Sequence, residues 1–150
     1  MYVAVVGAGD ASPAEIEAAE AIGHALAEAG AIVVCGGLGG VMAAACRGAV
    51  DAGGLTIGLL PGPDRAAANQ WVRVALPTGL GELRNGLVVR AADAVIAVGG
   101  AYGTLSEVAL ALKTGVPVIG FDTWDIDGIE TVASPREAVA RALEAIHPHT

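Results

Sequence analysis

Short apolar runs alternate along the chain with longer stretches in which alanine is frequent. The runs consist largely of valine, isoleucine and leucine, and a continuous apolar run bounded by turn residues is typical of a strand buried on both faces. Arg73 interrupts one run and gives it the alternation of a strand with one polar side. We expect strands at residues 2–6, 31–35, 55–60, 72–76, 94–98 and 116–120, and a short last strand at 129–132.

The stretches between the strands have the spacing of helices. In the first, apolar positions from Ile16 to Leu26 form one helical face, and Gly30 ends the pattern. Ser12-Pro13-Ala14-Glu15 and Ser134-Pro135-Arg136-Glu137 are capping boxes with proline at the first helical position. We expect helices at about 12–30, 41–51, 81–91 and 104–114, and a last helix from 134.

This alternation predicts an α/β fold: a three-layer, Rossmann-like, doubly wound and mostly parallel sheet of about six or seven strands. No internal repeat or linker interrupts it, so we expect a single domain over residues 1–150. Ligands of such sheets bind outside the carboxyl ends of the strands, where the strand order reverses. Glycine runs at 7–9, 36–40 and 99–103 all follow strands, and we expect all three to line that edge.

The first glycine run begins like a dinucleotide-binding fingerprint but does not complete it. Gly7 and Gly9 fit its first two glycines, whereas Ser12 occupies the position of the third. The second strand ends at Cys35 without the acidic residue that would bind a ribose diol. We therefore exclude an NAD-dependent dehydrogenase and keep Gly7 and Gly9 as candidate ligand-binding residues.

The other two glycine runs have stronger features of phosphate binding. Each lies between a buried strand and a helix start, where backbone N–H groups point outward and glycine lets an anion approach closely. A tight turn needs only about one or two glycines, so we favour phosphate binding over a purely structural turn. The ring of Tyr102 would also stack on a base. The candidate residues are Gly36, Gly37, Gly39, Gly40, Gly99, Gly100, Ala101, Tyr102, Gly103 and Thr104.

Two charged residues accompany these loops. Glu107 ends Thr104-Leu105-Ser106-Glu107, itself a good capping box, so from the residues alone it is either a helix cap or a catalytic acid. Arg84 opens a predicted helix, where a cation opposes the helix dipole, and we therefore expect an anion beside it.

Three segments together resemble the LOG-like family, also called lysine decarboxylase-like. They are Gly36-Gly37-Leu38-Gly39-Gly40-Val41-Met42, residues 77–85, and Gly99-Gly100-Ala101-Tyr102-Gly103-Thr104-Leu105-Ser106-Glu107. The resemblance covers roughly residues 1–120, and its GGxxGTxxE signature is fairly specific. It implies a 5′-phosphate held by Gly100, Gly103 and Thr104. It also implies Glu107 as a catalytic glutamate and Arg84, 23 residues before it (107 − 84), as a catalytic arginine.

The family includes cytokinin riboside 5′-monophosphate phosphoribohydrolases and molybdenum-cofactor-carrier-like proteins. Val98 and Asn85 stand where the hydrolases have proline and lysine, so the chain looks more like the short bacterial carrier-like branch. The leading hypothesis is a site that binds a nucleoside 5′-monophosphate, AMP-like, and hydrolyses its N-glycosidic bond to free base and ribose 5-phosphate. The alternatives are a non-catalytic carrier or sensor of a phosphorylated pterin or nucleotide, and a structural domain of a larger assembly. The resemblance also implies a homo-oligomer, a dimer or higher.

Composition and charge restrict the classes of partner that we expect for this chain. The chain is 54% hydrophobic and 16% charged, and its net charge of −8 repels a nucleic-acid backbone, so we expect a phosphorylated small molecule and no nucleic acid. A single phosphate remains possible because backbone N–H groups bind it without a charged side chain. The first apolar run is too short for a signal peptide, and the longest uncharged stretch, 29–46, is interrupted by five glycines, unlike a membrane helix. We therefore expect a cytoplasmic protein without a membrane partner.

We expect neither a cofactor nor a metal. Pyridoxal phosphate needs a lysine, and the one lysine, Lys113, is predicted in the last turn of a helix whose other end faces the ligand edge, which excludes a lysine decarboxylase. Cys35 and Cys46 lack CxxC spacing and are expected to be buried free thiols. They form no ligand set with the histidines, which are His24, His147 and His149.

Overall fold

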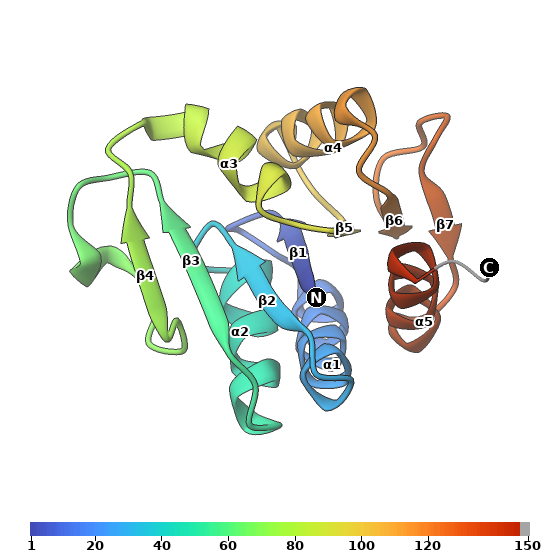
Figure 1. The fold of residues 1–150 in the computed structure, drawn as a ribbon, viewed down its shortest axis with the longest axis horizontal. Coiled ribbons are helices and arrows are strands. Elements are labelled where there is room, and N and C mark those ends of the chain that lie inside the picture. The colour runs from blue at the N-terminus through green and yellow to red at the C-terminus, as the bar shows by residue number, and fades with distance from the viewer. Residues whose placement is uncertain (148–150) are drawn as a thin grey trace.

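The computed structural model describes residues 1–147 and contains one seven-stranded sheet with parallel pairing throughout those residues (Figure 1). The strands are β1 (Tyr2–Gly7), β2 (Ile32–Cys35), β3 (Thr56–Leu60), β4 (Val74–Pro77), β5 (Ala94–Val98), β6 (Val118–Phe121) and β7 (Glu130–Val132). Their order is β4-β3-β2-β1-β5-β6-β7, so the direction of winding reverses between β1 and β5. The predicted fold class is confirmed. His149 and the end of the predicted domain lie outside the described residues.

Helices cover both faces of this sheet and make the three layers (Figure 1). One layer contains α1 (Pro13–Glu28), α2 (Val41–Asp51) and α5 (Pro135–Ile146), and the other contains α3 (Arg84–Arg90) and α4 (Tyr102–Thr114). Two short 3₁₀ turns, η1 (Arg65–Ala67) and η2 (Gly81–Leu83), lie in the connections on either side of β4. Each helix that follows a strand therefore begins near the carboxyl edge of the sheet, where ligands bind in this fold.

Burial on both faces explains why the central strands are continuously apolar. Val3 and Val5 of β1 pack into the core under α1, α2 and α5, whereas Ala4 and Val6 pack into the core under α3 and α4. All of β5 is inaccessible to solvent. Successive side chains of a strand point to opposite faces, so a strand covered on both sides needs apolar residues at every position.

The capping predictions have three different outcomes. The box at Ser12 is confirmed, because Ser12 Oγ accepts from Glu15 N at 3.1 Å and Glu15 Oε1 accepts from Ser12 N at 2.8 Å. At Ser134 one half forms, since the carboxylate of Glu137 accepts from Ala133 N rather than from Ser134 N. The box at Thr104 is wrong, because α4 begins two residues earlier at Tyr102 and leaves Glu107 inside the helix.

The predicted helix at 81–91 is observed as η2 followed directly by α3, and Gly81, with a positive φ of 61°, is the first residue of η2. Arg84 is the first residue of α3, as the sequence predicts.

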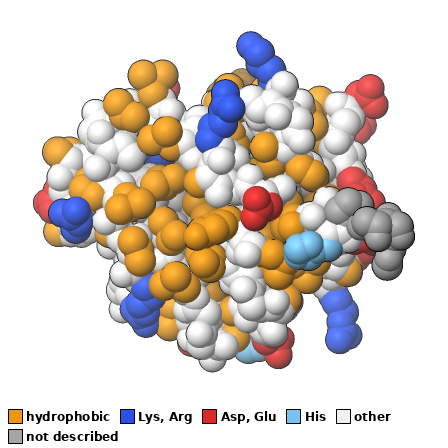
Figure 2. All heavy atoms as spheres, viewed as in Figure 1, with side chains coloured by type: hydrophobic (Ala, Val, Ile, Leu, Met, Phe, Trp, Pro, Cys, Tyr) orange, Lys and Arg blue, Asp and Glu red, His pale blue; other side chains and the backbone are white. Residues whose placement is uncertain are grey.

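Apolar side chains also reach the surface beside β4, the strand at one end of the sheet, and Figure 2 shows them gathered over that side of the molecule. They include Leu55, Val74, Leu76, Leu80 and Leu83. No helix within residues 1–147 has both the length and the apolar character needed to cross a bilayer.

Candidate functional site

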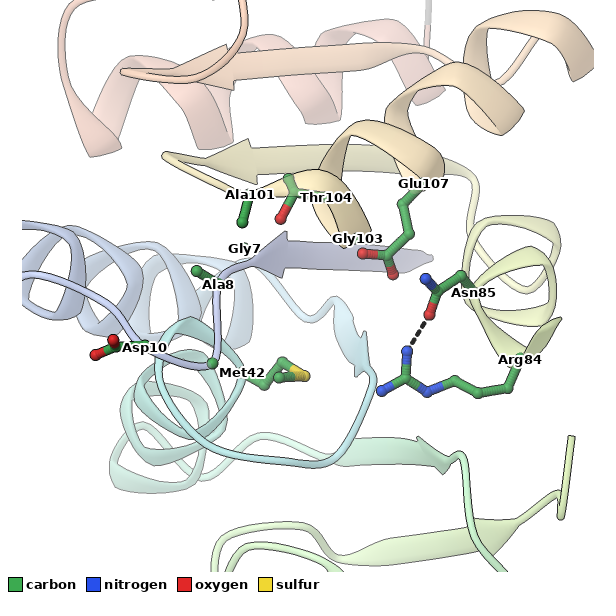
Figure 3. Close-up of a pocket in the computed structure, with 11 residues that line it drawn as sticks. Gly7, Ala8, Asp10, Met42, Arg84, Asn85, Ala101, Gly103, Thr104 and Glu107 are labelled. Atoms are coloured by element: carbon green, nitrogen blue, oxygen red, sulfur yellow. Dashed lines mark hydrogen bonds between the residues drawn. The ribbon is translucent and has the colours of Figure 1, made fainter. Parts of the chain in front are cut away.

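A cleft of about 430 Å³ lies at the switch point between β1 and β5, where the fold predicts a ligand site (Figure 3). Its floor and walls come from the loop after β1, the start of α2, the start of α3 and the first turns of α4. The lining residues are Gly7, Ala8, Gly9, Asp10, Met42, Arg84, Asn85, Ala101, Gly103, Thr104 and Glu107.

The N-terminus of α4 opens into this cleft. Its N-cap residue, Ala101, is extended and has no side chain that bonds the first-turn N–H groups, which are therefore available to a ligand. Gly99 and Gly100 have φ values of 56° and 124°, so glycine is required to turn the chain from β5 into the helix. Thr104 is 3% exposed and directs its hydroxyl into the cleft (Figure 3). Together these groups form an anion-binding helix start.

Arg84 supplies a buried positive charge on the opposite wall. It is 9% exposed, and its guanidinium donates from Nη1 to Asn85 Oδ1 (Figure 3). It also donates from Nη2 to the carbonyl oxygen of Gly36 at 3.4 Å. Its Nε is buried and has no hydrogen-bond partner among the described residues. No carboxylate of residues 1–147 forms an ion pair with it. A buried cation without an anion is unfavourable, so Arg84 is poised for an anionic ligand.

Glu107 lies on the same side of the cleft as Thr104, one helical turn further along α4. It is 7% exposed, and this burial raises the pKa of its carboxyl from the ordinary 4.5 to about 7, against the opposing effect of the Arg84 guanidinium. Arg84 and Glu107 are thus brought to one cleft from separate segments, as the sequence predicts, without contacting each other as an ion pair in the described chain.

The loop at 36–40 lies beside this cleft but does not line it. A Cβ at Gly36 would lie 2.6 Å from Arg84 Nη2, one at Gly37 would meet the side chain of Leu60, and one at Gly40 would overlap the carbonyl oxygen of Ala8. These glycines make room for other parts of the same chain.

The chain matches the SLOG cluster4 family over residues 1–146. It belongs to this family. The predicted resemblance to the LOG-like family and to its molybdenum-cofactor-carrier-like branch is confirmed. A relative in Archaeoglobus fulgidus is 39% identical over 140 residues, which are 93% of this chain and 92% of that one.

Solved structures similar to this SLOG cluster4 protein agree with that branch. The molybdenum cofactor binding protein from Rippkaea orientalis is 36% identical, with a TM-score of 0.91 over 97% of this chain and 96% of that one. The molybdenum cofactor carrier protein from Chlamydomonas reinhardtii is 31% identical, with a TM-score of 0.89 over 97% and 98%. DNA processing protein A from Helicobacter pylori, 19% identical with a TM-score of 0.73 over 96% and 80%, shares the fold alone.

Three other predicted residues of the SLOG cluster4 protein line neighbouring pockets rather than the main cleft. Gly99 and Gly100 lie in a pocket of about 340 Å³ together with Glu15 and with residues 122–124, which follow β6. Tyr102 lines a smaller pocket that shares Asn85 and Gly103 with the main cleft. Gly7, Gly9, Ala101, Gly103 and Thr104 line the main cleft as predicted.

Four residues of the cleft were missed by the sequence prediction. Ala8 lies between Gly7 and Gly9, Asp10 follows Gly9, Met42 is the second residue of α2, and Asn85 follows Arg84. The available signal was position, because three of them lie directly beside a glycine or arginine that the sequence singled out, and Met42 lies two residues after Gly40.

Two buried thiols support the loop at 36–40. Cys35 and Cys46 are free and fully buried, with their sulfur atoms 3.4 Å apart, and Cys35 Sγ accepts a hydrogen bond from Gly37 N at 3.3 Å. The hydrogen bond with Cys46, together with burial, raises the pKa of the Cys35 thiol. Residues 1–147 contain no cluster of three or more histidine, cysteine or acidic side chains arranged for a metal ion.

Proposed function

We propose that this SLOG cluster4 protein is a carrier that binds a phosphorylated pterin of the molybdenum-cofactor type in the cleft between β1 and β5. One observation carries the proposal: the buried guanidinium of Arg84, which lacks an anionic partner in the described chain, shares the cleft with the uncapped start of α4. The whole-length similarity to two proteins described as binding or carrying the molybdenum cofactor supports this ligand class.

The anionic end of the ligand fits the walls of the cleft. First-turn N–H groups of α4 and the hydroxyl of Thr104 would surround the phosphate on one side, and Arg84 would bind it from the other. Arg84 has an unused donor at Nε, so a phosphate would complete its hydrogen bonding. Because water is largely excluded around a side chain that is 9% exposed, these charge-assisted bonds are stronger than at a surface.

The raised pKa of Glu107 is compatible with an anion bound beside it. A pKa of about 7 leaves about half of the Glu107 side chains protonated at neutral pH. A partly neutral acid next to a bound phosphate also reduces the repulsion between two negative groups.

Hydrolysis of a nucleoside 5′-monophosphate is the second candidate function. It is favoured by the presence of Glu107 and Arg84 in one cleft, which is the arrangement that the family resemblance assigns to the hydrolases. In that case release of free base would rise with pH through about 7, as Glu107 ionises.

Binding and turnover are measured separately to test the proposal. Purified protein is titrated by calorimetry with a phosphorylated pterin and with AMP, and each mixture is examined by chromatography for free base and ribose 5-phosphate. We expect binding without products, and a loss of about a hundredfold in affinity for Arg84→Gln, because the buried charge-assisted bonds disappear. Arg90→Gln, which removes an exposed arginine of the same helix, is the control and should leave the affinity unchanged.

Each other result has a definite meaning. Absence of binding to both phosphorylated ligands contradicts the proposal. Release of free base from AMP that Glu107→Gln abolishes replaces it with the second candidate. The predicted homo-oligomer, the single domain over 1–150 and the cytoplasmic location stay predictions, and light scattering on the purified protein measures the first.

A further inference from the structure

A second pocket of about 180 Å³ adjoins the main cleft. It is lined by Glu82, Asn85, Tyr102, Gly103 and Ser106, and we call these five residues the ring pocket. Asn85 and Gly103 line both the ring pocket and the main cleft, so the two spaces meet at the start of α4. A ligand whose phosphate lies at the α4 start would therefore extend directly into the ring pocket.

Tyr102 forms an exposed aromatic wall of the ring pocket and stacks on a second aromatic ring. Its side chain is 82% exposed, which is unusual for a large aromatic group. The ring stacks with that of Trp124, with 6.3 Å between centroids and an interplanar angle of 28°. Trp124 is itself attached to the α4 start, because its Nε1 donates to the carbonyl oxygen of Ala101 at 3.3 Å. This contact favours the observed orientation of the tyrosine ring.

Trp124 and Tyr102 border different pockets. Trp124 lines the pocket that contains Gly99 and Gly100, whereas Tyr102 lines the ring pocket. Because its side chain is 82% exposed, Tyr102 keeps open surface in addition to its contact with Trp124. A flat aromatic ring in that position is a stacking surface for a planar heterocycle.

The polar groups of the ring pocket are rich in hydrogen-bond acceptors. Glu82, in η2, carries a carboxylate that only accepts when ionised, and Ser106 adds a hydroxyl that accepts as well as donates. Such groups complement the N–H edge of a heterocycle, above all an N–H beside an amino group, as in a 2-amino-4-oxopyrimidine ring.

We propose that the ring pocket binds the heterocycle of the phosphorylated ligand, which stacks on Tyr102 and donates the N–H groups of a 2-amino-4-oxopyrimidine edge to Glu82. The inference rests on the proposed function, because a phosphate at the start of α4 is what places the heterocycle beside Tyr102.

Three readily available ligands distinguish the contribution of stacking from that of phosphate binding. GMP has the 2-amino-4-oxopyrimidine edge, IMP has the same purine without the amino group, and ribose 5-phosphate has no ring. Affinities are measured by calorimetry for the wild type and for Tyr102→Ala, with Tyr102→Phe as the variant that keeps the stacking surface. Tyr2→Ala removes a half-exposed tyrosine at the opposite end of β1 and is the matched control.

The expected result is a selective loss. Tyr102→Ala should weaken GMP and IMP by about tenfold, the scale of one base stacked on an aromatic side chain, and change ribose 5-phosphate by less than about twofold. Tyr102→Phe and Tyr2→Ala should bind all three ligands like the wild type. Circular dichroism checks that each variant is folded.

The edge of the heterocycle is tested on Glu82. Glu82→Ala should weaken GMP by roughly fivefold and IMP by clearly less, because IMP keeps the ring N–H but lacks the amino group that the carboxylate also bonds. Glu17→Ala, an exposed glutamate of α1, is the control.

Failure of the ring pocket is distinct from failure of the proposed function. If Tyr102→Ala weakens all three ligands equally, or none of them, the ring pocket is wrong while phosphate binding stands. If Glu82→Ala affects GMP and IMP alike, the assigned edge is wrong. If the wild type binds none of the three, the ring pocket is wrong, while the proposed function is decided by the titration with the phosphorylated pterin.

Discussion

The loops at 36–40 and 99–103 look alike in sequence but have different surroundings in the structure. Both follow a central parallel strand, both are rich in glycine, and both lead into a helix. In the first, the space that side chains would fill is occupied by Arg84, Leu60 and the backbone of the β1 loop. In the second, Cβ atoms at Gly99 and Gly100 would meet the side chains of Glu15 and Thr104, but Gly103 faces the cleft and no described heavy atom lies within 4 Å of a Cβ placed there. A run of glycines predicts that another group lies close to the backbone, but not whether that group belongs to the protein or to a ligand.

The two loops still serve one site. The carbonyl oxygen of Gly36 accepts from Arg84 Nη2, and the absence of a side chain at Gly36 lets the guanidinium lie against the loop. The loop at 36–40 thus positions the cation, and the loop at 99–103 presents the helix start. Changes in the first should act on stability or on Arg84, and changes in the second on the ligand directly.

Gly40→Ala should have the largest effect on stability. Gly40 has a φ of 62°, and a Cβ there would overlap the carbonyl groups of Ala8 and Gly9, which are backbone and cannot rotate away. We expect a loss of about 3 kcal/mol or more in the free energy of unfolding. Urea denaturation measures it, with Gly62→Ala as the control because that turn is open. A loss below about 1 kcal/mol would show that the first loop is not tightly filled.

Ionisation of Glu107, which lies behind the second loop, should make stability fall as pH rises. The pKa is about 7 in the folded protein and 4.5 ordinarily, so the folded state holds a proton that the unfolded state releases between these values. The stabilisation is complete below pH 4.5 and is lost as pH rises through about 7. Between about pH 5 and 8 the wild type should lose about 2 kcal/mol relative to Glu107→Gln. Equal pH profiles in urea denaturation would contradict the burial of this carboxyl.

Gly36→Ala should weaken phosphate binding although Gly36 does not line the cleft. The new Cβ would lie 2.6 Å from Arg84 Nη2 and 2.8 Å from Met42 Sδ, both flexible ends that move more easily than backbone. We expect about a tenfold loss of affinity for ribose 5-phosphate, with less than about 1 kcal/mol lost from the free energy of unfolding. Unchanged affinity would mean that Arg84 is positioned without this loop.

Gly103→Ala should have the smallest effect on folding. Gly103 lies in the first turn of α4, and alanine there should leave stability the same or raise it by up to about 1 kcal/mol. Affinity for GMP should fall by roughly threefold, because the methyl group enters the space that the main cleft and the ring pocket share. A clear loss of stability would remove the distinction between the two loops.

Local patterns were sufficient to predict the sheet. The strand at 94–98 and the helix at 41–51 begin and end where the sequence predicts, because burial on two faces and a glycine before the helix are local signals. The start of α4 was missed because Ala101 ends the loop without a side-chain cap. Thr104 and Glu107 are three residues apart, a spacing that fits a capping box and equally one face of a helix.

The residues of the site could be predicted only where a local sequence pattern or the family resemblance marks them. Arg84 and Glu107 were found from helix position and family resemblance. The contact between Arg84 and Gly36 joins residues 48 apart, and no local pattern reports it. The stacking of Tyr102 on Trp124 likewise depends on how the segment after β6 folds back toward α4, which the sequence alone did not reveal.

The single buried guanidinium sits inside a strongly acidic protein, and this has a consequence for how fast the cleft fills. A dianionic phosphate approaching from a distance meets a net charge of −8, and it meets attraction only after entering the cleft. Added salt screens the long-range repulsion between the phosphate and the acidic protein more than it screens the short-range attraction to the buried guanidinium. Loading should therefore become faster as ionic strength rises, the reverse of the behaviour of proteins that draw in anions with a basic surface.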